Sequence, residues 1–349
     1  MIHEHILSSS RVGIFTHINP DGDALGSSLG MAGYLEDLGK KYFVFLPTPW
    51  GESLDFMVPE RVRRHIKVWN FRRKAALEAM AASCDLMIGL DFNSPERTGC
   101  FCDLFRKAGC KKILIDHHLN PSAGDFDEIH SDIQVSSASE LLYRILKQMP
   151  ETGGSADGMN SITREAILTG ITTDTNNFAN SVFPSTLSAV GELIAAGTDR
   201  DAIIQQLYFR YPERRIRAQG AILDRLMKIT EEGVGYMVID REFQKKFGLK
   251  EGDTEGFVNI PLSIDSVRMS ILAKEDPDDD KRVRISIRSK KGTSAQQCAA
   301  RFFHGGGHEL ASGGKLIKGE DIASMDEAAF YIEKSTKEFF FSNISGQLE

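Results

Sequence analysis

The stretch VGIFTHINPDGD, residues 12–23, joins a short apolar run to a polar loop. Residues 12–16 have the unbroken apolar character of a buried strand. Pro20 and Gly22 then prevent a regular helix and allow a tight turn. From residue 24 to about residue 39 the pattern becomes helical and closes on glycine. The stretch therefore predicts a strand, a loop and a helix in succession.

The same strand signature returns three more times in the first half of the chain. It recurs at 42–46, 86–90 and 112–115, and helical patterns cover about 72–82, 95–108 and 137–149. Strands that alternate with helices indicate a mainly parallel α/β sheet flanked by helices. In such a sheet the ligand site lies at the carboxyl ends of the strands.

The pattern changes in the second half of the chain. A polar, glycine-rich stretch at 151–160 precedes four helical patterns, at about 162–172, 185–196, 200–208 and 213–230. Beyond residue 233 we expect strands at 234–239, 266–274 and 282–288, with helices at about 294–303 and 320–339. At 349 residues the chain is long enough for two domains. We predict a first domain over 1–200, a helical connector over 201–230 and a smaller α+β domain over 231–349.

Composition and charge exclude several classes of protein. With 41% hydrophobic and 26% charged residues the chain is an ordinary globular protein, and it has no apolar run long enough to span a membrane. The first residues lack the basic segment and apolar run of a secretory signal, and the five cysteines form no C-x-x-C pair. We therefore expect a cytoplasmic protein with free thiols. The formal charge of −7 argues against a broad grip on long duplex nucleic acid.

Acidic and histidine side chains follow three of the predicted strands. His17, Asp21 and Asp23 come after the first strand, Asp91 after 86–90, and the tripeptide Asp116-His117-His118 after 112–115. Because parallel strands end at one edge of a sheet, these side chains should converge. A mixed set of imidazoles and carboxylates without cysteine favours Mn²⁺, Mg²⁺ or a related divalent ion.

Asp174, in the segment GITTDT, is a weaker candidate. It follows an apolar helical pattern, where a polar residue is common without any function. Two cations nevertheless need more protein ligands than the three strand ends supply, so we include Asp174 in the predicted site.

These pieces, in their order along the chain, resemble the four motifs of the DHH phosphoesterase superfamily. Farther along, Gly305-Gly306-Gly307-His308 resembles the glycine-rich motif of the DHH-associated C-terminal domain. The resemblance spans roughly residues 10 to 315. The chain is most similar to the subgroup of nanoRNases (oligoribonucleases) that also dephosphorylate 3′-phosphoadenosine 5′-phosphate.

The resemblance implies two metal ions that share Asp91. The first ion would be held by His17, Asp21 and Asp91, and the second by Asp23, Asp91, His117 and Asp174. His118 would face the substrate phosphate and take part with Asp91 in catalysis, while Asp116 would support the histidine pair as a hydrogen-bond acceptor. Which histidine of the pair binds metal is left open. The family implies Mn²⁺, with Mg²⁺ or Co²⁺ as alternatives, and attack on phosphorus by a hydroxide that bridges the two ions.

In the second domain the glycine motif and Arg288 are candidate substrate contacts. A glycine run lets backbone approach a phosphate or a base, although a plain turn before a strand has the same composition. Arg288 closes a predicted strand, and its planar fork suits a terminal phosphate, although a surface ion pair is an equal alternative. Relatives usually continue the motif as His-x-x-Ala-Ala-Gly, whereas here Ser312 precedes Gly313.

Three functions remain open at this point. The first is hydrolysis of short oligoribonucleotides and phosphoadenosine phosphate. The second is an exopolyphosphatase, a pyrophosphatase or a phosphodiesterase for cyclic or linear dinucleotides. The third is a noncatalytic nucleotide-binding protein, against which the complete set of metal ligands argues. A membrane partner is not expected, and a homodimer is left open.

Overall fold

The computed structural model describes residues 2–345. The chain divides into two compact units, with the boundary between Arg210 and Tyr211. Of the helices predicted for the connector, α9 (Arg200–Tyr208) belongs to the first unit and α10 (Glu213–Arg225) to the second.

A six-stranded parallel sheet, ordered β3-β2-β1-β4-β5-β6, is the centre of the first unit. Its strands are β1 (Arg11–Phe15), β2 (Lys41–Leu46), β3 (Ile66–Val68), β4 (Leu86–Leu90), β5 (Lys111–Asp116) and β6 (Glu128–Ser131). The expected parallel α/β sheet is confirmed. The two edge strands, β3 and β6, were not predicted, because they are short and only half-buried and so carry no apolar run.

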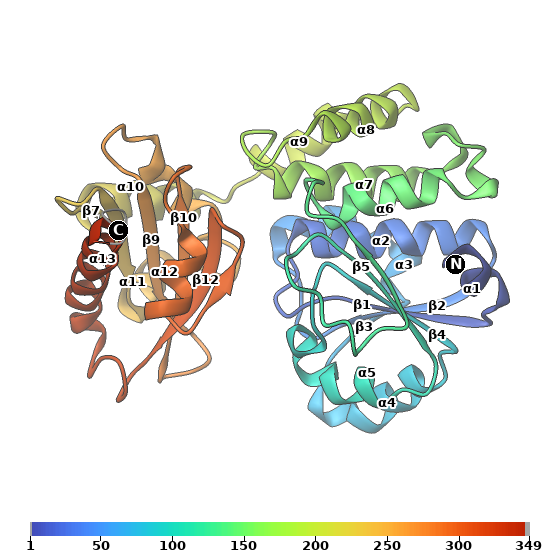
Figure 1. Cartoon of the computed structure of the whole chain (residues 1–349), viewed down its shortest axis with the longest axis horizontal. Coiled ribbons are helices and arrows are strands. Elements are labelled where there is room, and N and C mark those ends of the chain that lie inside the picture. Colours follow the sequence, from blue (N-terminus) through green and yellow to red (C-terminus); the bar gives the residue numbers. More distant parts are fainter. Residues whose placement is uncertain (1, 346–349) are drawn as a thin grey trace. The chain divides into compact units, whose positions relative to one another are not determined.

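Helices cover both faces of this sheet (Figure 1). One face carries α2 (Gly22–Asp37), α6 (Ala138–Lys147) and α7 (Ser161–Asp174), and the other carries α4 (Lys74–Ala82) and α5 (Cys102–Lys107). Side chains alternate between the faces along each strand: Ile14 joins the core beneath α2, whereas Phe15 joins an aromatic core beneath α5. The remaining helices of the unit are α1 (Ile2–Ser8), α3 (Glu60–Arg63), α8 (Pro184–Ala195) and α9, with 3₁₀ turns at Glu52–Met57, Phe71–Arg73, Pro95–Phe101, Pro150–Thr152 and Ala156–Gly158.

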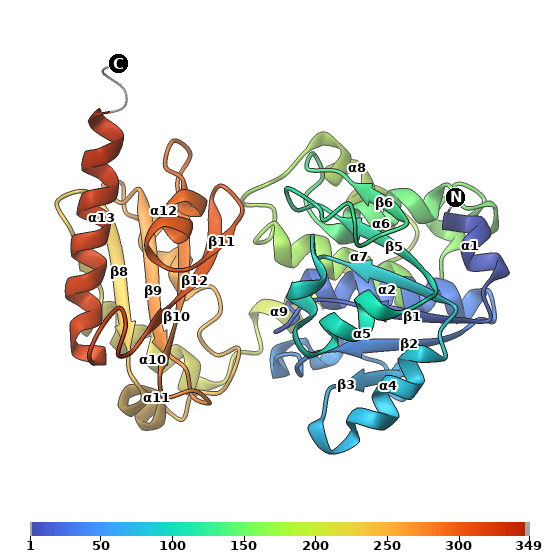
Figure 2. The same cartoon turned by 60° about the horizontal axis from the view of Figure 1, so that its bottom comes forward.

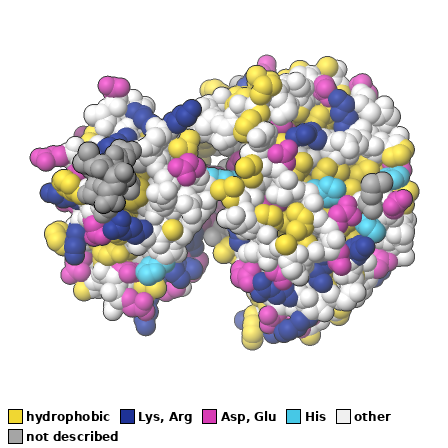
Figure 3. Space-filling view, viewed as in Figure 1, with side chains coloured by type: hydrophobic (Ala, Val, Ile, Leu, Met, Phe, Trp, Pro, Cys, Tyr) yellow, Lys and Arg dark blue, Asp and Glu magenta, His cyan; other side chains and the backbone are white. Residues whose placement is uncertain are grey.

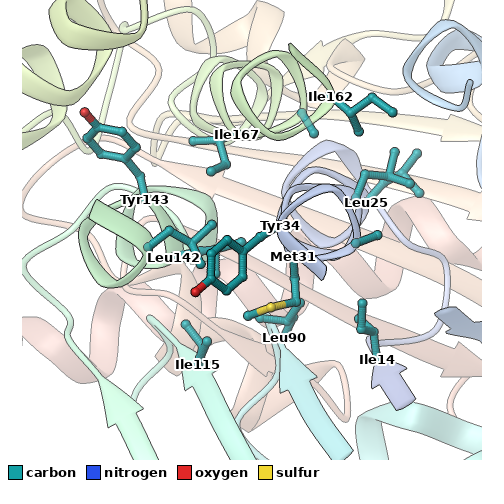
Figure 4. Close-up of a cluster of buried hydrophobic side chains, with 14 of the residues drawn as sticks. Ile14, Leu25, Met31, Tyr34, Leu90, Ile115, Leu142, Tyr143, Ile162 and Ile167 are labelled. Carbon is teal, nitrogen blue, oxygen red and sulfur yellow. The ribbon is translucent and has the colours of Figure 1, made fainter. Parts of the chain in front are cut away.

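The helix α2 is buried on every side from Gly22 to Leu35. It lies between the strands below and α6 and α7 above, so its apolar side chains contact both layers (Figure 4). Contact with α7 runs through glycines. A Cβ at Gly26 would stand 2.7 Å from the carbonyl oxygen of Ala166 and 2.9 Å from the Cα of Gly170. Only a residue without a side chain lets the two backbones approach so closely.

Three predicted helices have different limits in the structure. The helix expected over 95–108 is broken at Gly99, whose φ of 56° lies in the left-handed region. The helix expected over 213–230 ends at Arg225, and β7 (Lys228–Ile229) follows. The helix expected over 320–339 starts only at α13 (Ala328–Ser345), because the side chain of Asp321 accepts from the amide of Ile317 and folds the preceding segment into a turn.

The second unit is built on a six-stranded mixed sheet, ordered β11-β12-β10-β9-β8-β7. Its main strands are β8 (Val234–Ile239), β9 (Met269–Glu275), β10 (Arg282–Ser289), β11 (Gly306–Gly307) and β12 (Ala311–Ile317). One face packs against α12 (Ala295–Phe302) and α13, and the other against α10, α11 (Arg241–Phe247) and the 3₁₀ turn Phe257–Ser263 (Figure 2). A further 3₁₀ turn, Met325–Glu327, leads into α13. The expected α+β character of this region is confirmed.

Within the described residues, no helix combines the length and the apolar character that a membrane crossing requires. All five cysteines are free thiols, as expected from their spacing.

The contact between α2 and α7 can be tested by adding a single methyl group. We expect Gly26→Ala to lower the free energy of unfolding by roughly 1–3 kcal/mol, because overpacking against backbone atoms outweighs the better helix propensity of alanine. Gly191→Ala in α8 is the matched control, since a Cβ there meets nothing within 4 Å. It should raise the stability by about 0.5–1 kcal/mol. Urea unfolding of both variants measures the difference, and equal stabilisation by both would contradict the close packing.

Candidate metal centre

Three neighbouring strands of the first sheet end beside one another. In the sheet order, β2 and β3 lie on one side of β1, and β4, β5 and β6 lie on the other, so the direction in which strands are added reverses at β1. In open α/β sheets ligands bind at the carboxyl ends of the strands where the order reverses in this way. His17 follows β1, Asp91 follows β4 and His117 follows β5. The topology therefore brings the predicted residues to one place.

Asp21 has two roles at the start of α2. Its Oδ1 accepts hydrogen bonds from the amides of Asp23 and Ala24, at 3.1 and 3.0 Å, and so caps the helix. Its Oδ2 lies 3.9 Å from Nε2 of His17. The other ring nitrogen of His17, Nδ1, donates to the carbonyl of Ile18 at 2.8 Å. In the neutral ring this bond leaves the lone pair on Nε2, which faces the carboxylates.

Asp91 lies at the centre of the cluster. Its Oδ2 is 3.3 Å from Nε2 of His17, and its Oδ1 is 3.5 Å from Nε2 of His117. The residue is 3% exposed, and its φ of 61° is left-handed, a strained conformation that aspartate tolerates better than most residues. The fold thus holds one buried carboxylate between two histidines that come from different strands.

Asp23 is held from the opposite side by the first turn of α6. Its two carboxylate oxygens accept from the amides of Ala138 and Ser139, at 2.7 and 2.9 Å. Nε2 of His117 lies 3.8 Å from Asp23 Oδ2 and 3.7 Å from Asp174 Oδ2. Asp174, the weakest of the sequence candidates, therefore does lie beside the other residues, at the end of α7. It gets there because α7 packs antiparallel on α2.

The buried charges perturb one another strongly. Burial raises the pKa of Asp23 well above its ordinary value, and the charges of Asp91 and Asp174 raise it further. Burial also works to raise the pKa of Asp91, yet the imidazoles of His117 and His17, 3.5 and 3.3 Å from its carboxylate oxygens, hold that pKa well below its ordinary range. Burial opposes charge on His117, but the surrounding carboxylates raise its pKa. The carboxylates of this cluster therefore carry more negative charge than the two imidazoles can neutralise.

His118 takes part in a separate hydrogen-bonded chain. Its Nδ1 lies 2.7 Å from Oδ1 of Asp116, and its Nε2 lies 2.8 Å from Nη1 of Arg97. Arginine can only donate, so Nε2 of His118 accepts and Nδ1 carries the proton that it donates to Asp116. Asp116, expected to support both histidines, is thus the partner of His118. The ring of His118 is fixed in one neutral tautomer.

Arg97 is a residue of this site that the sequence did not indicate. It lies in the 3₁₀ turn Pro95–Phe101, six positions after Asp91, and its carbonyl accepts from the amide of Ile18 at 2.8 Å. The sequence did offer one signal: Arg97 is a cation shortly after the strand that Asp91, a predicted metal ligand, follows. The first turn of α6 was missed as well, although its serine-rich start is typical of a helix N-terminus.

In the second unit the predicted substrate contacts lie on adjacent strands. Gly306 and Gly307 form β11 and pair with Gly313 and Ser312 of β12. A Cβ at Gly305 would stand 2.0 Å from the carbonyl oxygen of Gly313, so this position has no room for any side chain. Arg288 of β10 pairs with Ala311, also of β12, and its Nη1 donates to the carbonyl of Ile287 at 3.0 Å. His308 follows β11 directly and its amide bonds to Ala311.

The cluster in the first unit has the chemistry of a divalent cation site. Its nitrogen and oxygen atoms stand 3.3 to 3.9 Å apart, longer than good hydrogen bonds, as expected of ligands that share a cation. Among the residues that the structure describes, the buried atoms Asp91 Oδ1 and Asp116 Oδ2 have no hydrogen-bond partner. Among the groups that lie wholly within the described part of the first unit, three have donor atoms within 4.8 Å of one another, and all three include Asp91: they are His17, Asp21 and Asp91; Asp23, Asp91 and His117; and Asp91, Asp116 and His118. The residues present therefore fit a pair of cations that share Asp91.

Metal binding should stabilise the fold by relieving repulsion among these carboxylates. We expect a chelator to lower the melting temperature and Mn²⁺ to restore it, since each site filled at a hundred times its Kd adds about 2.7 kcal/mol. Asp91→Asn should abolish the response and reduce the bound metal below two ions per chain. Asparagine is the variant of choice because it keeps the left-handed backbone.

Asp103→Ala, which removes an exposed carboxylate that pairs with Lys107 across one helical turn, is the control and should bind metal like the wild type. Metal analysis of the two variants decides the matter: two ions retained by Asp91→Asn would remove Asp91 as the shared ligand.

Comparisons with known proteins agree with this architecture. Residues 11–171 match the DHH family, N-terminal domain, and residues 231–334 match the DHHA1 domain. A bifunctional oligoribonuclease and PAP phosphatase NrnA from Thermus thermophilus is 28% identical over 88% of this chain and 85% of its own length. The protein of that name from Bacillus subtilis is 28% identical over 89% of each chain.

A solved structure covers nearly the whole chain. It is titled an exopolyphosphatase-related protein from Bacteroides fragilis, is 32% identical, covers 97% of this chain and 95% of its own, and has a TM-score of 0.86. With the ordered motifs and the cluster of imidazoles and carboxylates, these matches establish the family. The chain belongs to the DHH family and is a metal-dependent phosphoesterase with a DHH N-terminal domain and a DHHA1 domain.

Proposed function

We propose that this enzyme hydrolyses short oligoribonucleotides and 3′-phosphoadenosine 5′-phosphate with two Mn²⁺ ions. The observation that carries the proposal is the pair of ligand groups that share Asp91, with one carboxylate oxygen turned to each histidine. Support for the substrates comes from relatives whose names describe both activities.

In this proposal His17, Asp21 and Asp91 would hold the first ion. Asp23, Asp91, His117 and Asp174 would hold the second. Two such ions supply Lewis acidity toward the phosphate and lower the pKa of the water that attacks it. The new bond forms between the oxygen of that water and phosphorus, while the bond from phosphorus to the leaving oxygen breaks. A proton from the water ends on the leaving group or in solvent.

The protein's own contribution is to hold its ligands in place before substrate arrives. The first-turn amides of α6 fix the carboxylate of Asp23, and the carbonyl of Ile18 fixes the ring of His17. Oriented ligands avoid reorganisation during the reaction, which is the main source of electrostatic catalysis.

We assign His118 and Arg97 to the substrate phosphate. Asp116 keeps the ring of His118 in one orientation, and Arg97 places a guanidinium beside it at 2.8 Å. A planar guanidinium is suited to a phosphate with two parallel hydrogen bonds, and a phosphate oxygen can replace His118 Nε2 as its acceptor. Nε2 of His118 then donates to the phosphate after it takes up a proton, because a phosphate oxygen accepts hydrogen bonds and Nδ1 already donates to Asp116.

In the second unit, Arg288, Gly305, Gly306, Gly307 and His308 are the proposed contacts to the rest of the nucleotide. Gly306 is exposed and a Cβ there would meet nothing within 4 Å, so a phosphate or a base edge can approach the backbone closely at this position. The amides of Gly305 and His308 already donate to the carbonyls of Ala299 and Ala311.

The substrate is tested by a hydrolysis panel with Mn²⁺. It comprises di- to pentaribonucleotides, phosphoadenosine phosphate, cyclic di-AMP and polyphosphate, and Asp91→Asn serves as the control for contaminating nucleases. We expect turnover of the oligoribonucleotides and of phosphoadenosine phosphate, and a loss of at least about 10²-fold in the variant. Faster turnover of polyphosphate or of the cyclic dinucleotide would move the assignment to the second function considered above.

The division of labour between the two adjacent histidines makes a second test. We expect His117→Ala to lose bound metal together with activity, because His117 is assigned as a ligand. His118→Ala should keep both ions and lose roughly 10²-fold in kcat, since it removes a phosphate contact. Metal content measured beside kcat separates the two roles, and loss of an ion from His118→Ala with none lost from His117→Ala would reverse the assignment.

A further inference from the structure

A strongly basic segment interrupts the acidic chain of the first unit. Residues 60–74, ERVRRHIKVWNFRRK, contain seven lysines and arginines and one glutamate. The segment therefore carries +6, whereas the whole chain carries −7, so the other 334 residues carry −13. A local excess of this size attracts anions in spite of the net charge.

The segment lies along the edge strand of the parallel sheet. It contains α3, then β3, then the 3₁₀ turn Phe71–Arg73 and the first residue of α4. Lys and Arg side chains gather along the lower border of the N-terminal unit, where Figure 1 draws α4 (Figure 3). At the amino ends of β1 and β2 the basic surface continues into an open groove of about 850 Å³. The cations that line this groove are Arg11, Lys40, Lys41, Arg61 and Arg64. We call the segment 60–74 and these groove cations the basic edge.

Internal ion pairs neutralise the basic edge only in part. Arg61 lies 3.3 Å from Glu36, and Lys74 lies 3.7 Å from Glu78. Both cations are more than half exposed, and surface pairs of this kind contribute little. Within residues 2–345, Arg72 and Arg73 have no ion pair, and both are exposed. Burial lowers the pKa of Lys67, and the charge of Arg73 lowers it further, which indicates crowding of like charges.

An exposed aromatic ring stands beside the two unpaired arginines. Phe71 is 83% exposed, the largest exposure among the large hydrophobic side chains that are described as exposed. A ring in this position adds almost nothing to the core, whereas aromatic rings among cations are the stacking platforms of proteins that bind single-stranded nucleic acid.

The position of the ring connects the basic edge to the metal centre. Because β3 is parallel to β1, β4 and β5, its carboxyl end lies at the edge of the sheet where the metal ligands gather. Only β2 separates β3 from β1, a distance on the order of 10 Å at about 4.8 Å per strand. Phe71 to Arg73 follow that carboxyl end, and the groove lies at the opposite end of the sheet.

We propose that the basic edge binds the sugar-phosphate backbone of a single-stranded RNA, with Phe71 stacking on a base, outside the nucleotides that the metal centre contacts. The proposal rests on the proposed function in taking RNA as the ligand. The cations follow the edge strand β3 from its carboxyl end, on the side of the metal centre, to its amino end, on the side of the groove, and an extended RNA backbone could follow the same line. The exposed ring favours unpaired bases. A strand longer than a few nucleotides would thus gain binding energy that a dinucleotide cannot.

Binding can be measured without turnover. The probe is a fluorescein-labelled 16-nucleotide oligoadenylate, titrated with the full chain in EDTA at several salt concentrations and read by anisotropy. We expect Arg72→Gln/Arg73→Gln to weaken binding roughly tenfold and to reduce the slope of log K against log salt by about 1.4, at roughly 0.7 for each phosphate contact.

Lys245→Gln/Lys246→Gln in α11 is the matched control, because it removes the same charge from two exposed positions of the second unit. Its affinity should stay within about twofold of wild type. If both double variants weaken binding equally, the effect comes from net charge alone and the proposal is overturned. Unchanged affinity in both variants would overturn it as well.

Phe71→Ala tests the stacking separately. We expect affinity for the oligonucleotide to fall by at least about fivefold, whereas Phe330→Ala, at a ring 69% exposed on α13, should have no effect. Polyglutamate and anionic phosphatidylserine vesicles are the competitors. Binding of either through Arg72 and Arg73 in preference to the RNA would overturn the choice of partner.

Turnover of dinucleotides by the wild type tests the proposed function independently. If the protein binds the 16-mer through the basic edge but hydrolyses no oligoribonucleotide, the proposed function is refuted and the RNA-binding role of the basic edge is retained. A protein that hydrolyses dinucleotides but binds the 16-mer equally in both double variants would refute the surface alone.

Discussion

The close contact between α2 and α7 is the constraint on which the metal centre depends. The two helices run antiparallel, and a methyl group at Gly26 or Gly170 would already collide with neighbouring atoms. The start of α2 therefore lies beside the end of α7, which places Asp23 next to Asp174. The same contact leaves room for Ser139, since a Cβ at Gly170 would stand 2.0 Å from its hydroxyl oxygen. In this way the first turn of α6 reaches the carboxylate of Asp23.

The second constraint is the accumulation of negative charge where three strands end. Asp23 and Asp91 are almost fully buried, and Asp91 additionally adopts a left-handed backbone. A fold tolerates buried like charges and backbone strain where the surroundings enforce them and a bound cation compensates them. The shift of the pKa of Asp23 upward and of Asp91 downward expresses this competition. Stability and function are thus linked in the proposed site, because the groups proposed to bind metal are those whose charges oppose folding without it.

Charge in this protein is distributed unevenly along the chain, and the net charge does not reveal this distribution. The total of −7 correctly describes a chain with many carboxylates, several of which serve as proposed metal ligands. It says nothing about residues 60–74, where cations follow the edge of the sheet. The net charge therefore argues against binding of long duplexes, which requires a broad basic face. It does not argue against binding of a single strand along the narrow basic edge.

The amino-acid sequence by itself determined the parallel sheet and the identity of the strand-end residues, because buried strands leave apolar runs and the candidate site residues follow them directly. His17, Asp91 and His117 could be named for that reason. The edge strands β3 and β6 could not, since half-buried pairing leaves no apolar run. Asp174 was a weak candidate in sequence, because only packing on α2 brings the end of α7 to the site. Asp116 was named from the sequence as a partner of the histidine pair, but the second partner of His118 and the amides that hold Asp23 were decided by the tertiary structure alone. Arg97 and the α6 amides reach them across 21 and more than 100 residues of chain, and no local pattern records a contact made at that separation.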